Sequence, residues 1–239
     1  MGAGRDRRRF VPALVVVAVL AVVAGAGVLA WLDVRGERDV LLVGDSIMRQ
    51  TGPALEEALP SHSIDNRGVN GSGLLNPQVY DWVDRLPGVV ARARPETTVV
   101  LFIGNYAPED EWWIDAAGDP VPPDTEAFYA EWREQAERIV AILEESGSDI
   151  VWVLPPPVSS AAGNRTIAGL RAVYEDLAAA HPSITLVDAA PPLSDDDGAY
   201  VGSVVLPDGG VVDLRTGDGV HLAPTGAALI AEEIAAAIR

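Results

Sequence analysis

From residue 39 onward, short apolar runs alternate with longer stretches of helical periodicity, and this alternation limits the folds open to the chain. The runs expected to form strands are 40–43, 63–66, 97–103, 150–154 and 184–187. The stretches expected to form helices are 47–59, 79–94, 125–145, 166–180 and 224–238. Strands that alternate with helices form a parallel sheet that is covered on both faces. The sequence therefore predicts an α/β fold, a three-layer α/β/α sandwich with a mainly parallel sheet.

Prolines and glycines add detail to this prediction. Pro87 falls inside the helix predicted over 79–94 and is expected to bend or split it. The three prolines 155–157 lack N–H groups, so the strand before them must end there. Residues 189–217 are rich in Pro, Asp and Gly, which is typical of a loop, with a short hairpin expected around residues 208–210.

Residues 10–32 form an uncharged apolar stretch that is long enough to cross a membrane. A helix of this length spans roughly 34 Å, and the hydrocarbon core of a bilayer measures about 30 Å. Four arginines precede the stretch, so the positive-inside rule keeps residues 1–9 in the cytoplasm. We expect a single-pass anchor over 10–32, with the lipid bilayer as its partner, and an extracytoplasmic domain over 33–239.

Two other interpretations of the apolar stretch remain open. A cleavable signal peptide is one, because Ala24-Gly25-Ala26 is a small-residue site that follows an apolar region. The apolar run continues past this site to Leu32, and Trp31 suits a membrane interface, which favours the anchor. A buried core helix is the other interpretation, and the length and the arginine flank argue against it. The anchor and the signal peptide both place the domain outside the cytoplasm.

The charge distribution argues against nucleic acid as a partner. The formal net charge of the chain is -18. Before Asp33 the only acidic residue is Asp6, against four arginines, so the rest of the chain carries all of the acidic excess and repels phosphate groups. The chain has no cysteine, which excludes disulfides, thiolate zinc sites and cysteine nucleophiles. It has no nucleotide-binding loop or zinc motif either, so we expect no cofactor and no metal ion.

Gly44-Asp45-Ser46 lies where the first predicted strand meets the first predicted helix. Sites in open α/β sheets form at this carboxyl edge, and a helix N-terminus supplies N–H donors and a positive field there. Ser46 is therefore a candidate nucleophile. By itself, however, the tripeptide favours a serine that only caps the helix.

A second polar motif, Asp218-Gly219-Val220-His221, precedes the last predicted helix. A serine nucleophile needs a base, and the base needs a carboxylate that fixes its tautomer. A carboxylate three residues before a histidine can supply that contact. The other two histidines fit less well, since His181 follows an expected helix end and His62 has no acid nearby. His221 is therefore the candidate base and Asp218 its partner.

Taken together, these motifs resemble those of the SGNH (GDSL-type) hydrolases, a superfamily of esterases and acyl-transferring relatives. Gly44-Asp45-Ser46 matches the block of the nucleophile, and Asp218 to His221 matches the last block. Asn66-Arg67-Gly68-Val69-Asn70-Gly71 matches the second block, and the blocks occur in family order. The resemblance implies a flavodoxin-like fold and a catalytic triad of Ser46, Asp218 and His221. It also implies an oxyanion hole to which Ser46 and Gly71 contribute backbone N–H groups.

The third block departs from the family pattern. The family has Gly-x-Asn after the third strand, with an asparagine that donates to the oxyanion, whereas this chain has Ile103-Gly104-Asn105-Tyr106. Keeping Gly104 in register puts Tyr106 at the asparagine position, and keeping Asn105 puts Ile103 at the glycine position. An amide is a compact donor close to the backbone, so we expect Asn105 rather than Tyr106 to complete the oxyanion hole.

Trp112 and Trp113 follow the third predicted strand in an acidic loop beside the expected site. Exposed aromatic rings can stack on a sugar or an acyl chain, so both are candidate substrate-binding residues, and packing of the loop onto the domain is an equal alternative. The sequence thus predicts an extracytoplasmic serine esterase that acts on an ester-linked acyl group, in keeping with a cell-envelope glycan or glycolipid. The alternatives are an O-acyltransferase with the same triad and a non-catalytic envelope-binding module on the same fold.

The anchor prediction is tested by how the full chain associates with membranes. Protease added to intact cells that have been stripped of their wall should digest the domain, because it lies outside. High-salt washing should not release the chain, because burial of the apolar stretch in lipid does not depend on ionic strength. Release of a soluble form that begins near Gly27 would instead establish a cleaved signal peptide.

Overall fold

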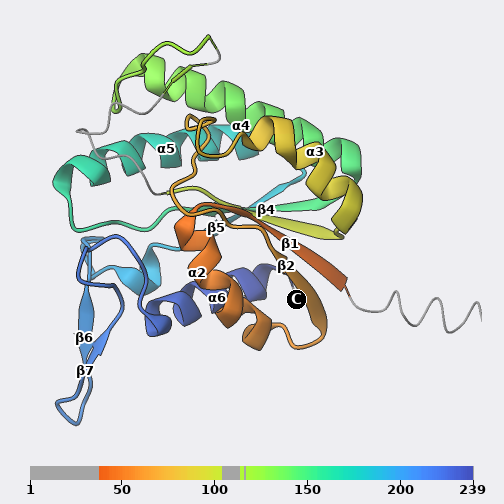
Figure 1. Cartoon of the computed structure of the whole chain (residues 1–239). Helices are drawn as coiled ribbons and strands as arrows, with labels where there is room; N and C mark the ends of the chain where they lie inside the picture. Colours follow the sequence, from red (N-terminus) through yellow and green to blue (C-terminus); the bar gives the residue numbers. More distant parts are fainter. Residues whose placement is uncertain (1–37, 104–113, 116, 239) are drawn as a thin grey trace, which may run out of the picture. The chain divides into compact units, whose positions relative to one another are not determined.

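The computed structural model describes residues 38–103, 114–115 and 117–238, which contain a central sheet of five strands (Figure 1). The strands are β1 (Arg38–Gly44), β2 (His62–Asn66), β3 (Thr97–Leu101), β4 (Asp149–Leu154) and β5 (Ile184–Asp188). Their order across the sheet is β2-β1-β3-β4-β5, and every neighbouring pair is parallel. The direction of winding reverses between β1 and β3, which is where flavodoxin-like sheets form their sites.

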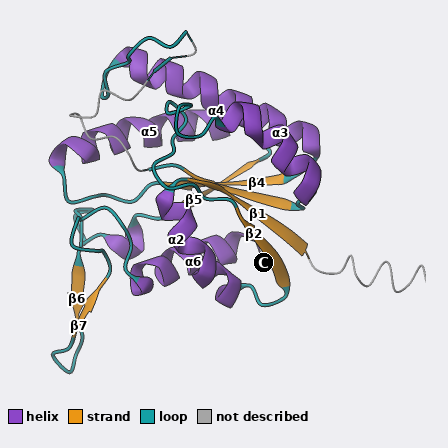
Figure 2. Cartoon of the chain, viewed as in Figure 1, coloured by secondary structure: helices purple, strands orange, loops and turns teal. Residues whose placement is uncertain are grey.

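Helices cover both faces of the sheet, as Figure 2 shows. One face carries α3 (Trp82–Ala93), α4 (Glu126–Ser146) and α5 (Ala161–Ala180), and the other carries α2 (Ser46–Ala58) and α6 (Pro224–Ile238). Between β5 and α6 the chain forms a 3-10 turn, η1 (Pro191–Leu193), and an antiparallel hairpin of β6 (Ser203–Val205) and β7 (Val211–Asp213). The predicted α/β/α layers, the parallel sheet and the hairpin around residues 208–210 are confirmed.

The core consists of two apolar clusters, one on each face of the sheet. Successive side chains of a strand point to opposite faces, so a central strand contributes to both clusters. In β1, the side chains of Leu41 and Val43 belong to the cluster between the sheet and the helices α3, α4 and α5. The side chains of Val40 and Leu42 belong to the cluster between the sheet and the helices α2 and α6. This double burial explains why β1 is a continuous apolar run rather than an alternating one.

The helix predicted over 79–94 differs from α3 at its start. α3 begins at Trp82 because the Asp81 side chain accepts a hydrogen bond from the Asp84 N–H, 2.9 Å away, and so caps the helix there. Pro87 lies inside α3 and does not split it, since one helix runs from Trp82 to Ala93. The proline lies in the second turn on the exposed side of α3, where it removes one backbone hydrogen bond without ending the helix.

Two other element boundaries also differ from the prediction. α5 begins at Ala161, five residues before the predicted start, because the Ser160 hydroxyl caps the helix by accepting from the Gly163 N–H. β3 ends at Leu101, two residues early, because the Ile103 N–H donates to a side chain, the Asp45 carboxylate, instead of to a neighbouring strand. This second difference places the end of β3 in contact with the Gly44-Asp45-Ser46 motif.

Within the part of the chain that the structure describes, no helix combines the length and the hydropathy needed to cross a bilayer. The predicted anchor over residues 10–32 and the predicted cytoplasmic segment over residues 1–9 lie outside the described residues.

His181 at the end of α5 forms an ionic cluster with two glutamates of α4. Its Nε2 lies 2.7 Å from Glu137 Oε2, and its Nδ1 lies 3.2 Å from Glu144 Oε1. Burial lowers the pKa of His181, but the two carboxylates outweigh it and raise that pKa above its ordinary value. Glu144 also accepts from the Ser183 hydroxyl, which together with His181 lowers the Glu144 pKa. When protonated, the imidazolium therefore ties the end of α5 to the C-terminal half of α4.

We expect replacement of His181 with Gln to destabilise the fold more at pH 6 than at pH 9. A raised pKa in the folded state stabilises the fold fully below the unfolded pKa of about 6.5, and this contribution is lost as the pH rises through the folded pKa. Because the groups are partly exposed, the difference should be about 1 kcal/mol or less in the free energy of unfolding, measured by urea denaturation. His62→Gln is the control, since the Ser61 hydroxyl is the only hydrogen-bond partner of the His62 ring among the described residues. An equal loss of stability at both pH values would show that the charge of His181 does not stabilise the fold.

Candidate active site

The end of β1 turns sharply at Gly44, beside the end of β3. A Cβ atom at Gly44 would lie 2.1 Å from the Leu101 carbonyl oxygen, so the two strand ends approach closely only because residue 44 has no side chain. The next N–H, that of Asp45, donates to the same Leu101 oxygen at 3.3 Å. The chain then enters α2 directly, which places Ser46 at the carboxyl edge of the sheet.

Asp45, rather than Ser46, caps α2. The fully buried Asp45 carboxylate accepts from the Ile47 N–H through Oδ1 at 2.9 Å and from the Ile103 N–H through Oδ2 at 2.6 Å. The interpretation of Ser46 as a simple helix cap is therefore wrong, because the cap belongs to the preceding residue. Ser46 is the first residue of α2 and is almost buried, at 6% exposure. Its N–H is one of the N-terminal donors that a helix leaves without an internal partner.

The structure brings Ser46, His221 and Asp218 together in one hydrogen-bonded chain. Ser46 Oγ lies 2.9 Å from His221 Nε2, and His221 Nδ1 lies 2.7 Å from Asp218 Oδ2. The imidazole side chain is 38% exposed, so solvent and small molecules can reach the end of this chain of contacts. This is the geometry that a serine nucleophile, a base and an orienting carboxylate require.

Hydrogen bonds keep the Asp218 carboxylate ionised. Its Oδ1 accepts from the N–H groups of Val220 and His221, each at 2.9 Å, and from the Thr216 hydroxyl at 2.8 Å. Burial raises the pKa of Asp218, but these bonds and the contact with the His221 ring outweigh it and hold the pKa well below its ordinary value. A carboxylate without a proton can only accept, so His221 Nδ1 carries the hydrogen. His221 Nε2 is then left as the acceptor that faces Ser46 Oγ.

Sequence reasoning missed the contacts that hold the Asp218–His221 turn in place. The Leu222 N–H donates to Gln50 Oε1 of α2 at 3.0 Å, one turn beyond Ser46. The Ser159 N–H donates to the Gly219 carbonyl at 3.0 Å, and a Cβ at Gly219 would lie 2.0 Å from Ser159 Oγ. A side chain that bonds to a remote backbone group leaves no motif in the sequence. The only signal there is the glycine at position 219, whose φ in the structure is 70°.

The second block lies beside the first. The Val69 N–H donates to the Gly44 carbonyl at 2.9 Å, which keeps the segment after β2 next to the turn that carries Ser46. Gly71 has a φ of 76° and occupies a tight turn. The Ser72 hydroxyl below it donates to the Val69 carbonyl and accepts from Trp82 Nε1. Gly71 is therefore held in the same region as Ser46, and its role as a backbone donor stays a prediction.

Four predicted site residues lie outside the described residues: Asn105, Tyr106, Trp112 and Trp113. Ile103, the first residue of the third block, donates its N–H to the Asp45 carboxylate. The third block therefore begins next to the Gly44-Asp45-Ser46 motif. Whether Asn105 or Tyr106 completes the oxyanion hole stays a prediction, as does the contact of Trp112 and Trp113 with substrate.

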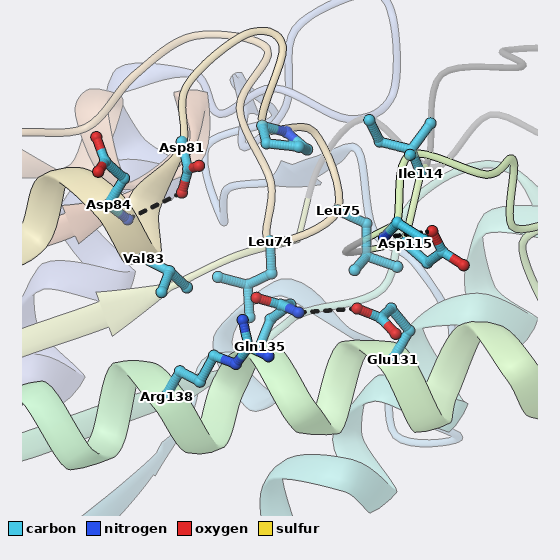
Figure 3. Close-up of a pocket in the computed structure, with 13 residues that line it drawn as sticks. Leu74, Leu75, Asp81, Val83, Asp84, Ile114, Asp115, Glu131, Gln135 and Arg138 are labelled. Atoms are coloured by element: carbon cyan, nitrogen blue, oxygen red, sulfur yellow. Dashed lines mark hydrogen bonds between the residues drawn. The ribbon is translucent and has the colours of Figure 1, made fainter.

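A cavity of about 500 Å³ lies away from the triad, between the segment after Gly71, α3 and α4 (Figure 3). Leu74 and Leu75 line it opposite Glu131 and Gln135 of α4, and the Gln135 amide donates to the Glu131 carboxylate at 2.8 Å. None of Ser46, Asp218 and His221 lines this cavity. Among the described residues, no cluster of His, Asp and Glu side chains is arranged to hold a metal ion.

The parallel sheet and its covering helices form the fold of the SGNH hydrolases, as solved structures show. A GDSL-like lipase from Bacteroides thetaiotaomicron VPI-5482 is 17% identical with a TM-score of 0.59, over 85% of this chain and 89% of the other. An acetyl xylan esterase is 16% identical with a TM-score of 0.60, over 84% and 100% of the two chains. An α/β hydrolase enzyme from the metagenome of Lake Arreo, Spain, is 15% identical with a TM-score of 0.62, over 84% of this chain and 94% of the other.

Residues 39–237 match the family model described as protein of unknown function (DUF459), and the chain belongs to this family. No curated protein matches the chain.

Removal of the Asp45 carboxylate should be more costly than removal of an ordinary helix cap. Asp45→Ala loses the cap of α2, which costs about 1 kcal/mol, and leaves the buried Ile103 N–H without its acceptor, which costs about 1–3 kcal/mol more. The matched control is Asp81→Ala, which removes the α3 cap alone and should cost about 1 kcal/mol. Urea denaturation gives both free energies of unfolding. Equal losses in the two variants would mean that the bond to Ile103 does not support the fold.

Proposed function

We propose that this protein is a serine esterase that hydrolyses ester-linked acyl groups, with Ser46 as nucleophile, His221 as general base and Asp218 as the orienting carboxylate. The observation that carries the proposal is the pair of hydrogen bonds from Ser46 Oγ to His221 Nε2 and from His221 Nδ1 to Asp218. Two of the proteins with the same fold are a GDSL-like lipase and an acetyl xylan esterase, which supports ester chemistry.

In the proposed reaction, Ser46 Oγ attacks the ester carbonyl carbon while its proton passes to His221 Nε2. The carbonyl oxygen becomes an oxyanion, which the N–H groups of Ser46 and Gly71 and the Asn105 side chain hold. The bond to the alcohol then breaks, and the alcohol leaves with the proton from His221. A water molecule repeats the sequence on the acyl-Ser46 intermediate, which releases the carboxylic acid and restores the serine.

The proposed substrate is an acyl ester of a cell-envelope glycan or glycolipid, reached by a domain that residues 10–32 anchor to the outer side of the cell membrane. The apolar stretch and the arginines before it support this location. Trp112 and Trp113 are the residues proposed to stack on the substrate, because they follow β3 in the chain and β3 ends beside Asp45.

We expect a fluorophosphonate probe to label the full chain covalently at Ser46. The probe reacts with a serine whose proton a neighbouring base can accept, and the 2.9 Å contact with His221 meets that condition. In-gel fluorescence with mass-spectrometric mapping identifies the labelled residue. Ser46→Ala should remove the label, whereas Ser61→Ala, at an exposed serine, should keep it. Labelling that persists in Ser46→Ala would move the nucleophile to another residue.

Replacement of His221 with Ala should reduce kcat for p-nitrophenyl acetate nearly as much as replacement of Ser46. Triad members act as a unit, so either change should cost on the order of 10⁴-fold or more. His62→Ala is the control and should leave kcat unchanged. A His221→Ala enzyme that keeps most of the wild-type rate would show that another group accepts the proton.

A further inference from the structure

Arg215 is the one arginine among the described residues whose side chain is buried, with 3% of its surface exposed. It has no carboxylate within salt-bridge distance in the described part of the chain. Burial lowers its pKa to about 10, so the guanidinium still carries its charge at neutral pH. A buried charge without an ion pair is costly unless hydrogen bonds satisfy it, and hydrogen bonds from a charged donor are stronger than neutral ones.

The guanidinium bridges two backbone carbonyls. Its Nη1 donates to the Val220 carbonyl at 2.6 Å, and its Nη2 donates to the Pro157 carbonyl at 2.7 Å. Val220 is the residue just before His221 in the Asp218–His221 turn. The guanidinium also lies over the Tyr200 ring, with its carbon 5.8 Å from the ring centroid, which stabilises the charge further.

Both carbonyls belong to segments that otherwise meet through one backbone hydrogen bond, from the Ser159 N–H to the Gly219 carbonyl at 3.0 Å. Pro157 ends a run of three prolines after β4, which have carbonyls but no N–H groups to pair with a neighbour. The turn itself is closed locally by the Thr216 N–H, which donates to the His221 carbonyl at 2.8 Å. Arg215 is therefore the side chain that fastens this local turn to the carboxyl end of a sheet strand. The planar, forked donors of an arginine suit two acceptors at once, which a lysine ammonium does not match.

We propose that Arg215 is a positioning residue that sets the orientation of His221 toward Ser46 by holding the Val220 carbonyl. This inference rests on the proposed serine esterase function. The hydrogen bonds of Arg215 go to backbone carbonyls rather than to the triad side chains, so it acts through the backbone of the turn. A small rotation of that turn would lengthen the contact between His221 Nε2 and Ser46 Oγ, and misplacement of a catalytic group by about 1 Å is worth roughly a hundredfold in rate.

Arg171 supplies the matched control. It donates to the Pro155 carbonyl at 3.2 Å and to both oxygens of Asp188, at 2.7 and 2.8 Å, so it holds the same proline segment without a hydrogen bond to the Asp218–His221 turn. Loss of either arginine removes a bond to the proline run. Only loss of Arg215 also removes a hydrogen bond to the turn that carries His221.

The experiment compares Arg215→Lys, Arg215→Met and Arg171→Met in the full chain, with p-nitrophenyl acetate as substrate and circular dichroism to fix a temperature at which each variant is folded. Arg215→Met should lower kcat roughly ten- to a hundredfold with KM changed less than about twofold. Arg215→Lys should recover only part of this loss, and Arg171→Met should keep kcat within about twofold. A folded Arg215→Met enzyme with the wild-type kcat, or an equal loss in Arg171→Met, would overturn the proposal.

A second readout does not depend on activity. Proton NMR should show a low-field resonance from the hydrogen on His221 Nδ1 that is bonded to Asp218, identified by its disappearance in His221→Gln. In Arg215→Lys this resonance should shift or broaden, and in Arg171→Met it should stay in place. A wild-type chain that shows the resonance but no ester hydrolysis would refute the proposed function alone. An unchanged resonance in Arg215→Lys would refute the positioning role.

Discussion

The buried Asp45 carboxylate is the contact on which the arrangement of the site depends. One oxygen caps α2, and the other accepts from the Ile103 N–H, 58 residues further along the chain. A fully buried carboxylate is stable only where N–H donors and a positive field surround it, and the N-terminus of α2 supplies both. The ends of β1 and β3 are joined here, so the serine that follows is held by the sheet rather than by a loop.

The proposed base reaches this serine from the other end of the chain. His221 and Ser46 are 175 residues apart in sequence and meet because α2 and α6 pack together on one face of the sheet. Gln50 of α2 holds the Leu222 N–H, and Arg215 holds the Val220 carbonyl, so the turn that carries His221 is fixed on both sides. One of these two bonds is neutral and the other is charge-assisted, and both go to the backbone rather than to the triad side chains.

Much of this fold could be predicted from the sequence, because apolar periodicity and prolines report on local structure. α6 spans Pro224–Ile238 as predicted, and β4 ends before the prolines that cannot pair. α5 was predicted to begin at residue 166 because the residues after Ser160 are small and polar, without helical periodicity. Its true start depends on the Ser160 cap and on Asn164, whose side chain bonds to both backbone groups of Val158.

What the sequence did not predict arises from contacts between elements that lie far apart in the chain. His181 was expected at a helix end, where it does lie, but its two glutamates belong to a different helix. Arg215 and Gln50 bind backbone groups, and a backbone group leaves no mark in the sequence. The proximity of Ser46, Asp218 and His221 was expected from the order of the motifs and from the family resemblance, and the distances between them could come only from the structure.

The separation of the two halves of the site along the chain has a consequence for biosynthesis. Ser46 is synthesised 175 residues before His221, and the contact between them needs α6 to pack beside α2. Parallel sheets with such distant pairings complete their folding late, after most of the chain is available. Until α6 docks beside α2, Ser46 therefore lacks the imidazole that the proposed reaction requires. The proposed ester cleavage is thus held back until both halves of the site have folded together.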